Sequence, residues 1–202
     1  MPWTFNRFTK QYVSPSGRKL TAQASAQLRN QFAAARSEIA KAMAEQLASG
    51  AITQAEFAAQ FAVFVEDTMT GAYLAGRGGA NAIVNTDLDS ILKLIDDQLG
   101  FADAFAKELD GLSADEIANR ASLYGDAAVG AYEQGVGASH GADLPGYAGD
   151  WETICKSGCR CYWSIVSTMD GDTTYNWITA SDDAVCEDCA RRGREWAPWV
   201  PA

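Results

Sequence analysis

The sequence predicts a mainly α-helical protein: a helical bundle with an extended N-terminal arm and a small C-terminal cysteine-rich β-hairpin module. Three observations support this prediction. Apolar residues recur at spacings of three and four through four long segments, the first 20 residues show no such period, and all five cysteines fall in the last quarter of the chain. With 202 residues, of which 48% are hydrophobic and 21% charged, the chain is long and apolar enough to form a folded core.

The extended arm is predicted over residues 1–20, which end in the turn-rich stretch Ser14-Pro15-Ser16-Gly17. The first 42 residues hold seven of the 16 Lys and Arg residues and one of the 26 Asp and Glu residues, whereas the whole chain has a net charge of -10. An acidic body repels polyanions, so general coating of DNA is disfavoured, but a basic arm suits an acidic partner or a nucleic acid locally. A solvated arm without a target explains the same charges equally well.

The helical bundle is predicted over residues 21–134. Its first helix starts near Thr21 and ends at Gly50, and its predicted buried face consists of Leu28, Phe32, Ala35, Ile39, Met43 and Leu47. The second helix starts at the capping box Thr53-x-x-Glu56, and its predicted buried face consists of Phe57, Phe61, Phe64, Val65, Met69 and Tyr73. The glycine-rich break at residues 76–79 follows no strand and precedes no Gly-Lys-Ser/Thr, so it indicates a connection between helices rather than a phosphate loop.

The third helix is predicted over residues 87–109, with its Asp residues outward and with Leu88, Ile91, Leu92, Ile95, Leu99, Ala102 and Phe105 inward. The fourth begins at a second capping box, Ser113-x-x-Glu116, and carries Ile117, Ala121, Tyr124, Ala128 and Tyr132. Four such helices joined by short turns favour a bundle. The carboxylates lie on polar helix faces, where solvation explains them better than catalysis does.

Residues 135–150 are predicted to form a linker, because glycines and a proline are frequent there. The only histidine, His140, falls in this segment and is predicted to be a surface residue of a loop. A Ser/His/Asp arrangement cannot be built on one loop histidine, so the sequence offers no catalytic residues.

The cysteine-rich module is predicted over residues 151–202. Its aromatic and β-branched segments 162–166 and 175–179 predict two strands, joined by a turn at Asp170-Gly171-Asp172. A short helix with a cap at Ser181 or Asp182 is expected to follow and to contain the last two cysteines.

A cysteine pair precedes the hairpin and another follows it, which is the layout of a zinc ribbon. The predicted zinc ligands are Cys155, Cys159, Cys186 and Cys189. Cys161, two residues beyond Cys159 on the same strand face, is a substitute for either neighbour. The odd number of cysteines, and an N-terminus without the layout of a secretion signal, favour a reducing compartment and a structural zinc ion over a disulfide framework.

Two other interpretations of the cysteines remain open. They are reduced residues packed as small apolar side chains, or one pair forms a disulfide late, in an extracellular particle. Redox catalysis by the Cys186-x-x-Cys189 pair is disfavoured, because no thioredoxin-like βαβ pattern surrounds it.

Several segments of the chain follow one another in a familiar order. After the basic aromatic arm come Ser49-Gly50-Ala51-Ile52-Thr53, Phe101-Ala102-Asp103-Ala104-Phe105 and the stretch from Leu112 to Tyr124. The module adds Leu144-Pro145-Gly146-Tyr147, Cys159-Arg160-Cys161-Tyr162-Trp163 and the stretch from Trp177 to Cys189. Together they resemble the minor head or head-morphogenesis proteins of tailed bacteriophages, over most of the chain.

This resemblance implies a non-enzymatic structural protein of the virion that acts in head assembly. The implied partners are other virion proteins, namely the portal or the major capsid protein, and further copies of the chain; no membrane is implied. The implied location is the virion, and the host cytoplasm during assembly. The alternative is a host-directed zinc-ribbon module that binds nucleic acid or a host protein, with steep salt dependence in the case of DNA.

The arm and the C-terminus supply the candidate partner contacts. In the arm these are Trp3, Phe5, Arg7, Phe8, Lys10, Arg18 and Lys19. Trp196, Trp199 and Pro201 form a second candidate patch, unless they close over the hairpin as local core.

Overall fold

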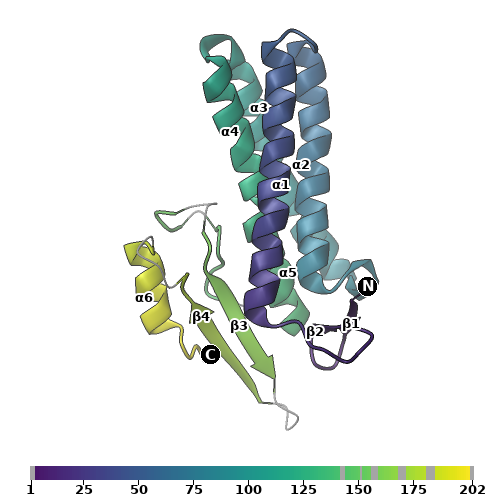
Figure 1. Ribbon diagram of the computed structural model, residues 1–202, viewed down its shortest axis with the longest axis vertical. Helices are drawn as coiled ribbons and strands as arrows, with labels where there is room; N and C mark the ends of the chain where they lie inside the picture. Colours follow the sequence, from purple (N-terminus) through teal and green to yellow (C-terminus); the bar gives the residue numbers. More distant parts are fainter. Residues whose placement is uncertain are drawn as a thin grey trace.

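The computed structural model describes residues 3–141, 144–150, 152–155, 159–167, 172–180 and 185–200. Long helices stand side by side, and the C-terminal hairpin lies beside the lower end of the first of them (Figure 1). The bundle consists of α1 (Ala22–Ala48), α2 (Gln54–Arg77), α3 (Asn85–Glu108), α4 (Ala114–Asp126) and α5 (Ala128–His140). Two single-turn 3₁₀ helices, η1 (Ala80–Ala82) and η2 (Leu109–Gly111), join these helices. The remaining elements are β1 (Thr4–Asn6), β2 (Gln11–Val13), β3 (Tyr162–Ser167), β4 (Thr173–Ile178) and α6 (Glu187–Glu195). The prediction of a mainly helical chain is confirmed.

Within the described ranges, no helix combines the length and the apolarity that crossing a membrane requires.

The start of α2 follows the predicted capping box. The Thr53 backbone N–H donates to Glu56 Oε2 at 2.8 Å, and the Glu56 N–H donates to Thr53 Oγ1 at 3.2 Å. Ser113 and Glu116 make the same reciprocal pair at the start of α4. Gly78, at φ 104°, ends α2 in the left-handed region that glycine adopts without steric cost.

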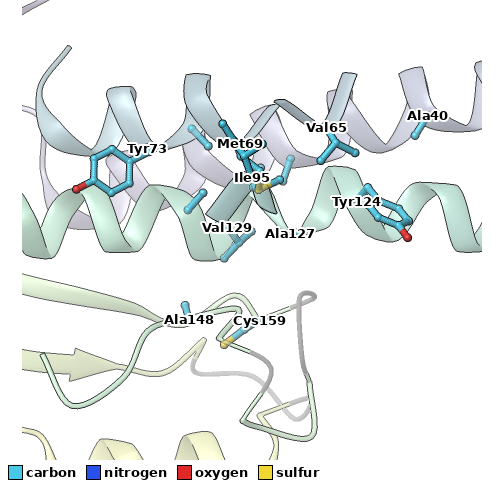
Figure 2. Close-up of a cluster of buried hydrophobic side chains, with 14 of the residues drawn as sticks. Ala40, Val65, Met69, Tyr73, Ile95, Tyr124, Ala127, Val129, Ala148 and Cys159 are labelled. Atoms are coloured by element: carbon cyan, nitrogen blue, oxygen red, sulfur yellow. The ribbon is translucent and has the colours of Figure 1, made fainter. Parts of the chain in front are cut away.

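Aromatic side chains of α2, α3 and α4 form the centre of the core. Phe61 packs edge-on against Tyr124 at a centroid distance of 4.9 Å and contacts Phe105 at 6.0 Å. Figure 2 shows how Val65, Met69 and Tyr73 continue the apolar face of α2 toward α5. All six residues of the predicted α2 face are buried: Phe57, Phe61, Phe64, Val65, Met69 and Tyr73.

The predicted buried face of α1 is partly correct. Phe32, Met43 and Leu47 are half-buried and pack against the core. Leu28 and Ile39 are 51% and 46% exposed. The helix instead buries small and polar residues: Ala26, Arg29, Ala33, Ser37, Ala40 and Ala44. The reason is the close approach of α4, where a Cβ atom placed on Gly125 would lie 2.2 Å from the backbone nitrogen of Ser37. Only small side chains fit between backbones this close, so Leu28 and Ile39 lie outward.

The predicted inward face of α3 is partly correct. Its buried positions include Ile91, Ile95, Ala102 and Phe105, whereas Leu88 and Leu92 are more than half exposed. Asp87, predicted to face outward, is also buried. It accepts hydrogen bonds from Tyr73 Oη at 2.8 Å and from Arg77 Nε at 3.0 Å, which explains how a carboxylate is tolerated there.

The predicted linker at residues 135–150 is also wrong in its first part. The fourth predicted helix breaks at Ala127 into α4 and α5, and α5 continues to His140, which is a half-buried helical residue and not a loop residue. The glycines of α5 allow close packing: a Cβ atom on Gly135 would lie 2.2 Å from the carbonyl oxygen of Tyr73 in α2. Likewise, a Cβ atom placed on Gly76 of α2 would lie 2.0 Å from the carbonyl oxygen of Tyr132 in α5.

The arm is a hairpin packed on the bundle, which corrects the prediction of an extended conformation. Antiparallel strands β1 and β2 bring Phe5 opposite Tyr12, with ring centroids 5.2 Å apart. Tyr12 Oη donates to the carbonyl of Ala75 at 2.8 Å, and Arg7 donates to the carbonyl of Asn81. These contacts hold the hairpin at the end of α2 in Figure 1.

The contact between Gly125 and α1 predicts a large effect of one methyl group. Gly125→Ala places a Cβ against the backbone of Ser37, so we expect a loss of about 1–3 kcal/mol in the free energy of unfolding. The matched control is Gly100→Ala, since Gly100 lies exposed in α3 with nothing near its Cβ position; we expect a gain of about 0.5–1 kcal/mol there. Urea unfolding followed by circular dichroism measures both, and equal effects would contradict the packing.

Candidate metal centre

The hairpin of the module is confirmed, with β3 and β4 antiparallel and Trp163 opposite Trp177. The predicted turn at Asp170-Gly171 and the predicted cap at Ser181 or Asp182 lie outside the described residues. Helix α6 begins at Glu187, so its cap is Cys186, whose Sγ accepts the backbone N–H of Cys189 at 3.5 Å. The predicted helix start is therefore corrected: Cys186 lies at its edge and Cys189 in its first turn.

The cysteine sulfur atoms converge, as the spacing predicts. Cys189 Sγ lies 3.5 Å from Cys155 Sγ and 3.6 Å from Cys159 Sγ, and Cys155 Sγ lies 3.7 Å from Cys186 Sγ. All five thiols are free. These separations far exceed the bond length of a disulfide, about 2.05 Å. The cluster is compatible with a metal site.

Cys161 belongs to the same cluster. In two groups of three, every pair of sulfur atoms lies within 4.8 Å: Cys155, Cys186 and Cys189 form one, and Cys159, Cys161 and Cys189 form the other. Cys189 is common to both. Cys159, Cys161 and Cys189 are buried, whereas Cys155 and Cys186 are half-buried.

The cysteine thiols of the cluster differ in pKa. A hydrogen bond from the Cys161 thiol lowers the pKa of Cys159 to about 5, and the same interaction raises the pKa of Cys161. Burial raises the pKa of Cys155 to about 11. A metal ion at this cluster would therefore displace protons from the protonated thiols, which makes binding weaker at low pH.

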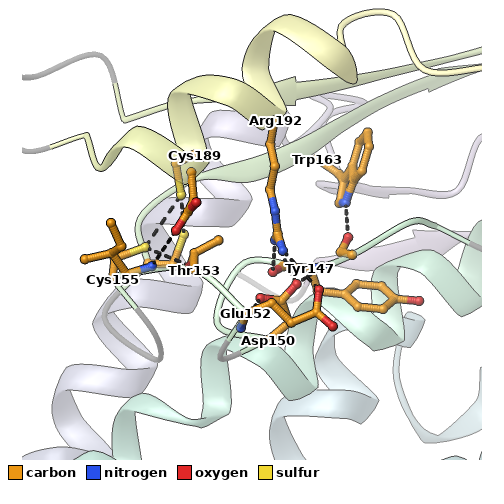
Figure 3. Close-up of polar contacts among 12 residues, drawn as sticks. Tyr147, Asp150, Glu152, Thr153, Cys155, Trp163, Cys189 and Arg192 are labelled. Atoms are coloured by element: carbon orange, nitrogen blue, oxygen red, sulfur yellow. Dashed lines mark hydrogen bonds and ion pairs between the residues drawn. The ribbon is translucent and has the colours of Figure 1, made fainter.

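Arg192 of α6 ties the segment before Cys155 to the helix that carries Cys189 (Figure 3). Its Nη1 donates to Asp150 Oδ2 at 2.7 Å and to the carbonyl of Tyr147 at 3.1 Å. The guanidinium also stacks 4.8 Å from the ring centroid of Trp196. Arg192 was not among the predicted site residues; its spacing of three residues from Cys189 places both on one face of α6.

The candidate docking patch at the C-terminus is local core in its described part. Trp196 stacks on Trp163 at a centroid distance of 5.7 Å, and the Trp199 N–H donates to the Tyr175 carbonyl at 2.9 Å. Pro201 lies outside the described residues.

A buried ion pair joins the module to the bundle. Arg29 of α1 and Glu133 of α5 are 3% and 2% exposed and bond to each other. Arg29 Nη1 also donates to the carbonyl of Cys161 at 3.0 Å, and the Trp163 N–H donates to Glu133 Oε2 at 3.5 Å. Burial raises the pKa of Glu133, and the charge of Arg29 opposes that shift. The pair thus fixes the start of β3, beside two cysteines.

The arm residues differ widely in exposure. Phe8, between β1 and β2, is 95% exposed, and Trp3 is 40% exposed. Arg18 and Lys19 are exposed, whereas Phe5 and Lys10 are half-buried. The seven predicted partner contacts therefore do not form one uniform free surface.

His140 lines a cleft of about 330 Å³ between the arm hairpin, the start of α1, the end of α5 and β3. Burial, together with the charge of Lys10, lowers the pKa of His140 to about 4. Its imidazole is therefore neutral at pH 7.

The fold and the cluster together define a helical bundle that carries a cysteine-rich centre compatible with a metal ion. Comparison of the chain with protein-family models, with curated proteins and with solved structures finds no match.

The buried ion pair between module and bundle predicts that the stability of the protein depends strongly on keeping both charges or neither. Arg29→Met leaves Glu133 buried without its partner, so we expect a loss of about 3–5 kcal/mol in the free energy of unfolding at pH 7. The double variant Arg29→Met/Glu133→Leu removes both charges and should lose clearly less. Urea unfolding followed by circular dichroism compares them; equal losses would contradict a mainly electrostatic cost.

Proposed function

We propose that the protein is a non-enzymatic structural protein of a bacteriophage head, acting near the portal or the capsid, with a structural zinc ion in its C-terminal module. The order of the sequence features supports the virion role, and the sulfur geometry supports the zinc ion. The implied partners are the portal or major capsid protein and further copies of the chain. No catalytic residues are part of the proposal.

The observation that most directly supports the zinc ion is the spacing of the sulfur atoms. Four thiolates placed about 2.3 Å from a tetrahedral zinc ion are about 3.8 Å apart. Three of the sulfur separations in the cluster are 3.5, 3.6 and 3.7 Å. The ligands are Cys155, Cys159, Cys186 and Cys189, with Cys161 next to them. Soft thiolates favour zinc over magnesium or calcium.

The architecture of the module explains why an ion is useful there. A two-stranded hairpin such as β3–β4 is marginally stable alone in water. An ion bound by Cys155, by Cys159 and by the first turn of α6 would crosslink three separate segments. Its binding free energy would then add to the folding free energy of the module.

The exposed tip of the arm hairpin supports a role in assembly. Phe8 is 95% exposed, although a side chain of this size usually gains free energy by burial. The backbone beside it is held by Asn6, whose Oδ1 accepts the N–H of Phe8 at 2.9 Å. An aromatic residue on a positioned turn is suited to insert into a pocket of a neighbouring subunit.

Metal analysis of the chain purified without chelator tests the zinc ion. We expect about one equivalent of zinc in the wild type, because four thiolates make one closed site. Cys189→Ser should lose it, because Cys189 belongs to both sulfur groups, whereas Cys161→Ser should keep it, because four thiols remain. Zinc below a tenth of an equivalent in the wild type, together with a disulfide found by mass spectrometry, would refute the site.

Phe8→Ala tests the assembly role. The side chain is exposed, so the free energy of unfolding should change by less than about 0.5 kcal/mol. Incorporation into particles, measured by mass spectrometry of purified virions, should fall severalfold. Phe101→Ala is the matched control, since Phe101 is 59% exposed on α3, far from the arm in sequence. Normal incorporation of Phe8→Ala, with salt-sensitive DNA binding by the free chain, would favour the nucleic-acid alternative.

A further inference from the structure

The sulfur cluster has an outer and an inner part. Cys155 and Cys186 form the outer pair: both are half-buried, and their Sγ atoms are 3.7 Å apart. Cys159, Cys161 and Cys189 form the inner triad: all three are buried, with every pair of sulfur atoms within 4.8 Å. A small oxidant from solvent therefore reaches the outer pair first.

The cluster also holds one thiol more than a tetrahedral ion needs. Four thiolates complete such a site, and the cluster has five. If the outer pair were lost as ligands, the inner triad would still offer three sulfurs. Without Cys161 the inner part would offer only Cys159 and Cys189.

We propose that Cys155 and Cys186 are a site of reversible oxidation by a peroxide, and that Cys161 lets the inner triad keep the metal ion when the outer pair becomes a disulfide. The formation of the disulfide depends only on the sulfur positions. The retention of the ion rests on the proposed zinc site, and it is measured separately below.

The chemistry balances with hydrogen peroxide as the oxidant. The Cys186 sulfur attacks one peroxide oxygen, the O–O bond breaks, and Cys186 becomes a sulfenic acid while one water leaves. The Cys155 sulfur then attacks the Cys186 sulfur, forming the S–S bond and releasing the hydroxyl group as a second water. In sum, two thiols are oxidised to one disulfide, and one hydrogen peroxide is reduced to two waters.

The geometry favours Cys186 as the attacking sulfur. It caps α6 at the edge of the cluster, where its Sγ accepts the N–H of Cys189, and it is half-buried, so a small oxidant reaches its sulfur from solvent. Cys155 is the nearest half-buried thiol, and the two sulfurs have to approach by less than about 2 Å to reach bonding distance. Cys189 lies slightly closer to Cys155, at 3.5 Å, but it is 1% exposed and belongs to the inner triad.

Peptide mapping tests the disulfide. The full chain, with and without bound zinc, is treated with one equivalent of hydrogen peroxide; free thiols are then blocked and the peptides are analysed by mass spectrometry. We expect a Cys155–Cys186 link in both samples, and no link in Cys155→Ser. A main product that joins Cys159, Cys161 or Cys189 to any partner would overturn the proposal, whether or not the chain binds zinc.

Zinc release, followed with a chromogenic chelator in the same reactions, tests the role of Cys161. After oxidation we expect the Cys161→Ser chain to release zinc about tenfold faster than the wild type, because only two inner thiols remain. Before oxidation the two should release it at similar rates. Equal release after oxidation would overturn the role of Cys161. Cys161→Ala repeats the comparison without a buried hydroxyl, in case the serine variant loses helicity.

Discussion

The arrangement of the molecule depends on the buried ion pair between Arg29 and Glu133. Burying two charges costs several kcal/mol unless the remaining hydrogen-bonding positions are also satisfied. Both side chains of this pair have such further hydrogen bonds. Arg29 donates to Asn30 and to the Cys161 carbonyl, and Glu133 accepts the N–H of Trp163. These conditions are met together in one placement of β3 against α1 and α5. The pair therefore determines where the hairpin, and the cysteines before it, lie.

The cysteine cluster is held from two sides. On the bundle side, the bond from Arg29 to the Cys161 carbonyl fixes the strand that carries Cys159 and Cys161. On the outer side, Arg192 joins α6 to the segment before Cys155 through Asp150. Two buried guanidinium groups thus position three chain segments, and the sulfur atoms meet where those segments converge. Positions set in this way are largely formed before any ion binds, which lowers the cost of ordering the ligands.

The sequence predicted the features that depend on local chemistry. The capping boxes at Thr53 and Ser113 are set by residues three positions apart, and the face of α2 is set by large apolar residues with few alternatives. The convergence of the cysteine pairs followed from the hairpin between them. These predictions need no knowledge of what packs against the element.

The errors lie where tertiary contacts override the local pattern. The large apolar residues of α1 suggested one fully buried face, but they are half-buried or exposed, and the backbone contact at Gly125 selects the neighbouring face with alanines and serine for full burial. Glycines in α5 suggested a linker because glycine usually interrupts helices, yet at Gly135 it allows α2 to approach. Arg29 and Arg192 could not be singled out, because an arginine within a helix gives no sign of which distant carboxylate it will meet.

The distribution of tryptophan gives the molecule a built-in optical probe. Trp163, Trp177, Trp196 and Trp199 all pack around the hairpin, whereas residues 21–140, which contain the five bundle helices, hold no tryptophan. Indole emission will therefore report mainly on the module and the arm, while far-ultraviolet ellipticity reports mainly on the bundle. The two signals resolve the halves of one chain without any label. Coincident transitions would mean that the halves unfold as one cooperative unit, and separate ones would mean that they unfold in turn.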